Sequence, residues 1–155
     1  MTNPTPTTGA SFAHAAALLT EHLADHALPE PTLLSVTTSY GHTTLTAQLR
    51  GTTLPGIAAD LLAWADTLSA VTVQVWRPPQ RDQVHLSILS TLTSSPGAIE
   101  LKVLGSVDYD PFRFADLQPH THRGMPLSLG QLRIWAAHPT TTTGIPALET
   151  HRAGR

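Results

Sequence analysis

The 155-residue chain contains no cysteine, and this absence excludes several kinds of chemistry. Disulfide bonds, thiolate catalysis and cysteine-ligated zinc all need the missing side chain. Charge is also scarce, because only 13% of the residues are charged, about half the usual fraction. Disorder normally goes with high net charge and few apolar residues, so this low charge, with an apolar fraction of 41%, indicates a folded chain.

Basic residues are few and scattered. The chain has nine Lys and Arg residues, only one of them lysine, and a formal net charge of −2. Binding to phosphate backbones needs clustered basic side chains, so we do not expect direct binding to nucleic acid or to an anionic membrane. No apolar run approaches the roughly 20 residues of a membrane-spanning helix. The first residues, MTNPTPTTGA, lack the basic and apolar regions of a secretion signal, which predicts a cytoplasmic protein.

The common catalytic motifs are missing as well. The sequence has neither of the glycine-rich phosphate-binding patterns, GxxxxGK[ST] and GxGxxG, and it has no HExxH. No serine lies in a Gly-x-Ser-x-Gly elbow. The sequence therefore leaves enzymatic activity open and favours a protein without it.

Apolar periodicity begins and ends inside the chain. Residues 1–10 and 139–155 are rich in threonine, proline and other polar residues and have no periodic apolar positions, which predicts two disordered tails. The residues between them, 11–138, are enough for a single domain with a buried core.

Three helices are predicted from apolar residues at helical spacing. The first begins after the N-cap residue Ser11 and ends near Ala27, before a proline. The second covers 55–69, with proline in its first turn, and the third covers about 127–137. The buried positions expected in the first helix are Phe12, Ala16, Leu19 and Leu23.

Between the first two helices, TLLSVTTSYGHTTLTAQLR alternates apolar and polar residues and predicts a hairpin. Gly41-His42 fits a two-residue type II′ turn, which needs glycine at its first central position. That turn brings the apolar residues of both strands to one face. The pairs that it predicts are Leu34 with Leu49, Val36 with Ala47, and Thr38 with Leu45.

Three further strands are predicted at 71–76, 84–92 and 98–107, where apolar residues alternate towards one side. The resulting order of elements is α-ββ-α-βββ-α. Consecutive strands joined by short turns favour antiparallel pairing. We therefore predict an α+β fold, with a mainly antiparallel sheet of about five strands and helices packed on one face.

LQPHTHRGM, at 117–125, places two histidines one residue apart in a long loop. In extended backbone His120 and His122 point to the same side, a spacing that zinc and iron sites use, and Asp108 could supply a third ligand. This pattern predicts a candidate metal site, with zinc as its candidate cofactor. The alternative is a polar loop in a chain that has nine histidines. His22 and His26, four residues apart on the first helix, are either a second chelating pair or a partly buried pair at the helix edge.

The polar face of the predicted sheet is the candidate partner surface. Hydroxyl and amide groups can pair with a partner's polar groups, so a surface rich in Thr and Gln is easier to desolvate than one rich in Lys and Glu. In the loop, DPFRFADL combines aromatic residues with arginine, as interfaces often do. The alternatives are that threonine satisfies strand propensity on a solvated face, and that the phenylalanines fasten the loop over the core. The candidate partner-binding residues are Thr37, Thr46, Gln48, Thr72, Gln74, His85, Ser87, Phe112 and Arg113.

The composition and layout resemble a family of small uncharacterised proteins found in actinomycetes, Streptomyces among them. The resemblance lies in ALPEPTLLSV, LLAWADTL, WRPP followed by VHLSI, and LGSVDYDP, and it covers most of 11–137. It implies no activity, cofactor or catalytic residue, because the family has none assigned. It does imply an association with mobile elements and regulatory genes, where members of the family occur.

Three functional hypotheses follow. The preferred one is a non-catalytic cytoplasmic binding or adaptor protein, acting as a homodimer, which contacts a protein partner through the Thr-rich sheet face or the 107–125 loop. The second is an accessory protein in nucleic-acid or regulatory transactions of a mobile element. The third is a metal-dependent enzyme or metal-binding protein that uses His120 and His122.

Overall fold

The computed structural model describes residues 12–94, 97–120 and 123–138. In these ranges three helices accompany a six-stranded sheet with the order β1-β2-β5-β4-β3-β6. The predicted α+β class, the mainly antiparallel sheet and the order α-ββ-α-βββ-α are confirmed, with a short sixth strand added before the last helix. The tails predicted at 1–10 and 139–155 lie outside the described residues.

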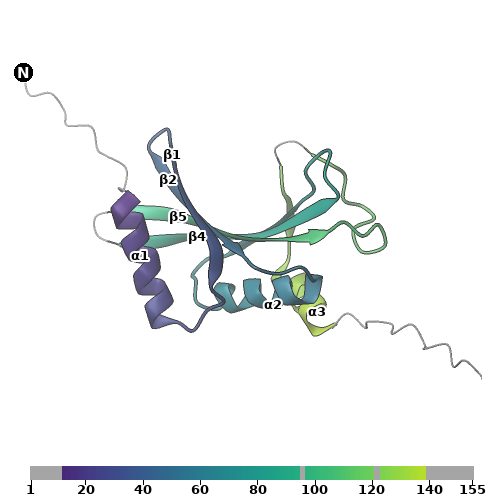
Figure 1. Ribbon diagram of the computed structural model, residues 1–155, viewed down its shortest axis with the longest axis horizontal. Helices are drawn as coiled ribbons and strands as arrows, with labels where there is room; N and C mark the ends of the chain where they lie inside the picture. Colours follow the sequence, from purple (N-terminus) through teal and green to yellow (C-terminus); the bar gives the residue numbers. More distant parts are fainter. Residues whose placement is uncertain (1–11, 95–96, 121–122, 139–155) are drawn as a thin grey trace, which may run out of the picture.

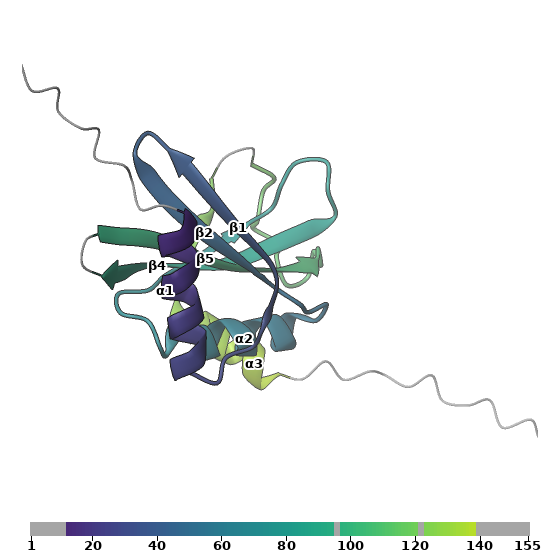
Figure 2. The ribbon, with the colours of Figure 1, turned by 60° about the vertical axis from the view of Figure 1, so that its left-hand side comes forward.

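All three helices lie on one side of the sheet (Figures 1 and 2). The helices are α1 (Phe12–Asp25), α2 (Leu54–Ala65) and α3 (Leu129–Ala137). The strands are β1 (Pro31–Ser39), β2 (His42–Leu49), β3 (Thr72–Trp76), β4 (Gln83–Ser94), β5 (Gly97–Asp108) and β6 (Met125–Leu127). The predicted helix cap Ser11 lies outside the described residues.

Local sequence explains where α2 and α3 begin. The Thr53 hydroxyl accepts a hydrogen bond from the Gly56 backbone N–H at 3.3 Å, and the Ser128 hydroxyl accepts one from Gln131 N–H at 3.1 Å. Each of these side chains satisfies a helix N–H that has no partner inside the helix. α3 begins later than predicted because residues 125–127 pair with β3 as a strand.

The predicted register of the β1–β2 hairpin is wrong. The structure pairs Leu34 with Ala47, Val36 with Leu45, and Thr38 with Thr43. The turn residues are Tyr40 and Gly41, with φ of 49° and 81°, and not Gly41-His42. Positive φ at both central residues is the requirement of a type I′ turn, which matches the strand twist. The partner of each β1 residue shifts by two positions, so the apolar residues stay on the predicted face.

The core lies between the sheet and the helices. Trp64 of α2 is the largest fully buried side chain, and its indole Nε1 donates to the Pro29 carbonyl at 3.1 Å. The buried stripe of α1 differs from the prediction, because Ala15 and Leu19 are buried while Phe12 is 70% exposed. Phe12 is the first residue of α1.

One pair of strands runs parallel, which the sequence did not predict. β5 lies between β2 and β4, pairing parallel with β2 and antiparallel with β4. The contact joins residues that are more than fifty positions apart, for example Leu45 with Leu101. None of the described helices is long and apolar enough to cross a membrane.

We expect Gly105→Ala to destabilise the fold, because α2 lies directly over this position of β5. A Cβ on Gly105 would lie 2.5 Å from Ile57 Cδ1 and 2.6 Å from its Cγ2. Overpacking of this kind costs about 1–3 kcal/mol of unfolding free energy, measured by urea denaturation. Gly97→Ala is the control, since a Cβ there meets nothing within 4 Å. Equal urea midpoints for the two variants would contradict the prediction.

Candidate functional site

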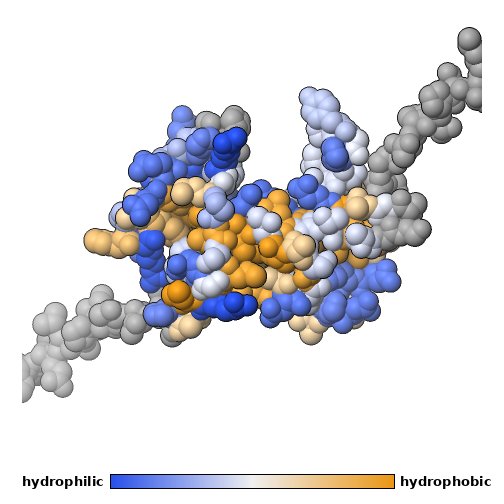
Figure 3. All heavy atoms as spheres, turned by 180° about the vertical axis from the view of Figure 1, so that it is seen from behind, coloured by the Kyte–Doolittle hydropathy of each residue, from blue (hydrophilic) through white to orange (hydrophobic). Residues whose placement is uncertain are grey.

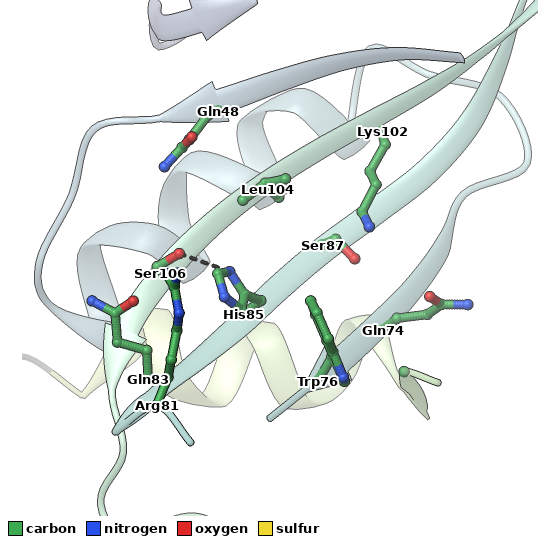
Figure 4. Close-up of a pocket in the computed structure, with 11 residues that line it drawn as sticks. Gln48, Gln74, Trp76, Arg81, Gln83, His85, Ser87, Lys102, Leu104 and Ser106 are labelled. Carbon is green, nitrogen blue, oxygen red and sulfur yellow. Dashed lines mark hydrogen bonds between the residues drawn. The ribbon is translucent and has the colours of Figure 1, made fainter. Parts of the chain in front are cut away.

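The sheet face opposite the helices is hollowed into a groove of about 670 Å³. In Figure 3 two projections rise on either side of a hollow. This volume falls within the range of about 300–1,000 Å³ that is usual for ligand sites. Its lining residues, most of them labelled in Figure 4, are Gln48, Gln74, Trp76, Arg81, Gln83, His85, Ser87, Lys102, Leu104, Ser106 and Gly124.

The strand register arranges this lining in rows across the sheet. One row joins Trp76 of β3, His85 of β4 and Ser106 of β5. The next row joins Gln74, Ser87, Leu104 and Gln48. Residues next to them in the sequence, such as Val75, Leu86 and Val103, are buried on the helix side. Period-two alternation therefore builds the core and the groove from the same four strands.

Contacts between side chains fix the first row. The indole of Trp76 stacks on the His85 ring with a centroid separation of 5.3 Å, and its Nε1 donates to the backbone carbonyl of His120. The Ser106 hydroxyl and His85 Nδ1 are 2.8 Å apart and share a hydrogen bond. These contacts hold the aromatic pair in place.

The groove carries positive charge without a matching carboxylate. Its two cations are Arg81, from the β3–β4 connection, and Lys102 of β5, and none of its lining residues is acidic. Glu100 and Asp108 share this face of β5, but neither forms an ion pair with Arg81 or Lys102 within the described residues. Burial lowers the pKa of His85, and the charges of Lys102 and Arg81 lower it further.

The structure brings together some of the predicted partner-binding residues. Gln48, Gln74, His85 and Ser87 all line the groove. Thr46 pairs with Lys102 beside it. Thr72 is exposed on β3, next to Leu89 of β4, and Thr37 lies on the exposed hairpin, opposite Thr44.

Phe112 and Arg113 lie away from the groove. They border a second hollow, of about 340 Å³, beside β6 and α3. Phe112 is 94% exposed, whereas Phe114 is buried with its ring edge-on to Trp135 at 5.5 Å. Only the second phenylalanine therefore fastens the loop over the core.

Several groove residues were not among the predicted site residues. Strand parity places Trp76 and Ser106 on the polar face, since they continue the alternation of Gln74 and Lys102. The alternation along β3 and β5 could therefore have identified both residues from the sequence. Arg81 and Gly124 come from connecting segments, and the path of those segments over the sheet depends on tertiary contacts such as the Trp76–His120 hydrogen bond.

The predicted metal site is only partly described. Asp108 pairs with Gln83 at the end of β5, and His120 Nδ1 accepts a hydrogen bond from the Arg123 backbone N–H at 3.1 Å. His122 lies outside the described residues. Within residues 12–94, 97–120 and 123–138 no group of three or more His, Asp or Glu side chains could hold a metal ion. The site involving His122 stays a prediction.

The other histidine pair packs α1 against α2. The His22 and His26 rings are 4.7 Å apart, and His22 also stacks on Trp64 at 6.0 Å. His22 Nε2 lies 2.9 Å from the Thr67 hydroxyl and shares a hydrogen bond with it. These contacts explain the pair as part of the helix packing.

Comparison with protein-family models, curated proteins and solved structures found no match for this chain. The actinomycete resemblance therefore stays a prediction.

We expect the protein to lose stability in mild acid through His22 and His85. Burial lowers the pKa of both; for His22, His26 lowers it further while Asp25 opposes the shift. Histidines in the unfolded chain titrate near about 6.5, so protonation favours unfolding. Their contribution is complete above that pH and is lost as the pH falls through the folded-state pKa values.

The urea midpoint at about pH 5.5 should therefore lie below that at about pH 7.5. The double variant His22→Gln/His85→Gln should reduce this difference, and His42→Gln, at an exposed position, is the matched control. An identical pH dependence in wild type and double variant would refute the assignment.

Proposed function

We propose that the protein is a non-catalytic, cytoplasmic binding or adaptor protein that holds a segment of a protein partner in the sheet-face groove. The groove itself carries this proposal. Four hydrogen-bonded strands hold most of its side chains, and side chains on strands keep more precise positions than side chains on loops.

The chemistry of the lining supports a peptide as the ligand. Gln48, Gln74 and Gln83 each offer an amide donor and an amide acceptor, which can pair with main-chain N–H and C=O groups. Trp76, held by His85 and by the His120 carbonyl, supplies a fixed aromatic surface. Fixed aromatic side chains frequently dominate the energy of protein interfaces.

Peptides selected from a displayed library on the immobilised protein should bind Trp76→Ala at least about tenfold more weakly, as expected for an interface aromatic. Affinity would be measured by fluorescence anisotropy, with urea unfolding as a check on the fold of the variant. Gln83→Ala, an exposed groove substitution, should also weaken binding. Tyr40→Ala is the matched control, because that aromatic ring is 100% exposed at the hairpin tip, outside the groove. Selected peptides that bind Trp76→Ala and Gln83→Ala as tightly as wild type would rule out the groove.

The proposal includes a homodimer formed through β1. Within the described residues β1 pairs with β2 alone, so its outer edge has unpaired backbone groups. Its sequence, PTLLSVTTS, has no charge, and Leu33 and Leu34 are 58% and 48% exposed. Natural edge strands are usually protected by charges, prolines or bulges, and here a proline and a bulge affect only the first residues. A second copy can pair with the remainder about a two-fold axis.

Sedimentation equilibrium should therefore give twice the monomer mass for the wild-type protein. Ser35→Lys, in the middle of β1, should give the monomer mass, because it would place like charges close together across the two-fold axis. Thr52→Lys adds the same charge at an exposed loop position and should leave the dimer intact. A wild-type protein that stays monomeric at micromolar concentration would remove the dimer from the proposal.

A further inference from the structure

The groove is positively charged, although the protein as a whole carries a net negative charge. The formal net charge of the chain is −2, and its only lysine, Lys102, lines the groove together with Arg81. The two cations come from separate elements, β5 and the β3–β4 connection, and both side chains reach the same hollow (Figure 4). The fold therefore brings together charges that are dispersed in the sequence.

Neither of these cations forms an ion pair among the described residues. The ion pair between Asp110 and Arg113 lies elsewhere. The lining contains no Asp or Glu. Two cations that share a hollow repel each other, and a bound anion would remove that repulsion.

His85 supplies a third potential donor between the two cations. Within the described residues its only hydrogen bond joins Nδ1 to the Ser106 hydroxyl, which leaves Nε2 for a ligand. The charged groups that face this ring are Lys102 and Arg81, and both lower its pKa together with burial. A bound carboxylate would oppose these effects, so binding would be accompanied by proton uptake and would strengthen as the pH falls.

We propose that the groove recognises an acidic peptide segment, with a side-chain carboxylate of the partner bound among Lys102, Arg81 and His85. This inference rests on the proposed function and specifies the class of partner. Charged hydrogen bonds from these donors orient the bound carboxylate and make the groove specific for acidic segments. The glutamines pair with the backbone of the segment. A nucleic acid fits less well, because its regularly spaced phosphates need a longer row of cations than these two.

The single lysine allows a direct test on the full chain. Reductive methylation with a ¹³C label modifies only Lys102 Nζ and the N-terminal amine, and it preserves the positive charge. The probe is a capped peptide of about eight residues with alternating Glu and Val, compared with the same peptide carrying Gln for Glu. Binding is followed by the Lys102 methyl resonance and, in unlabelled protein, by fluorescence anisotropy.

We expect the Glu peptide to shift the Lys102 resonance and to bind at least about tenfold more tightly than the Gln peptide, with a loss of affinity as salt is added. Its affinity should be higher at about pH 6 than at about pH 8. Lys102→Gln and Arg81→Gln should each weaken binding about tenfold. Arg133→Gln, the same charge change on the exposed surface of α3, should change affinity less than about twofold.

Other results would overturn the inference in distinguishable ways. Equal binding of the Glu and Gln peptides, or binding of library-selected neutral peptides alone, would reject the acidic partner and leave the groove as a peptide site. Acetate or inorganic phosphate that binds as tightly as the Glu peptide would identify a small-anion site instead. If no peptide, selected or designed, shifts the Lys102 resonance, both this inference and the proposed function fail.

Discussion

The antiparallel pairing of β4 with β5 determines what lies on both faces of the sheet. In this register Gln83 lies opposite Asp108 at one end and Ser94 lies opposite Gly97 at the other. The other edge of β5 pairs with β2. On the helix side the register sets Ile88 beside Val103 in the core. On the other side the same register sets His85 beside Ser106 in the groove. A one-residue slip would bury polar residues and expose apolar ones, so the stability of the core also fixes the geometry of the site.

Strand alternation was the feature of the sequence that predicted most of the fold and much of the groove. It identified the five longer strands, the buried faces of β2 to β5, and the polar residues Gln48, Gln74, His85 and Ser87. The hairpin register was missed because two kinds of primed turn fit the segment, and Tyr40 adopts a positive φ that is uncommon for a residue with a side chain. The parallel β2–β5 pairing was missed because it joins strands distant in sequence, and local pattern does not encode such a contact. Arg81 was missed for a similar reason, since it comes from a connecting segment.

The charge of the groove has an energetic cost in the free protein. Lys102 and Arg81 have no carboxylate partner among the described residues, and they make protonation of His85 less favourable. The repulsion among these groups adds nothing to stability, because removing either cation would reduce it. Clefts that collect one sign of charge instead attract ligands of the opposite sign and raise the rate at which they associate. The arrangement is therefore easier to understand as a feature of binding than as a feature of folding.

The edge strand and the groove are also related through the sheet. Leu33 of β1 pairs with Gln48 of β2, and Gln48 lines the groove, so the proposed dimer interface and the proposed binding site are neighbours. A two-fold axis that relates two antiparallel strands within one sheet is perpendicular to that sheet. Both grooves of the proposed dimer would therefore open to the same side of a continuous sheet. Two sites facing one way can engage two segments of a single partner, and the second contact then benefits from a high effective concentration. Modest affinity in each groove would be enough for stable association with such a partner.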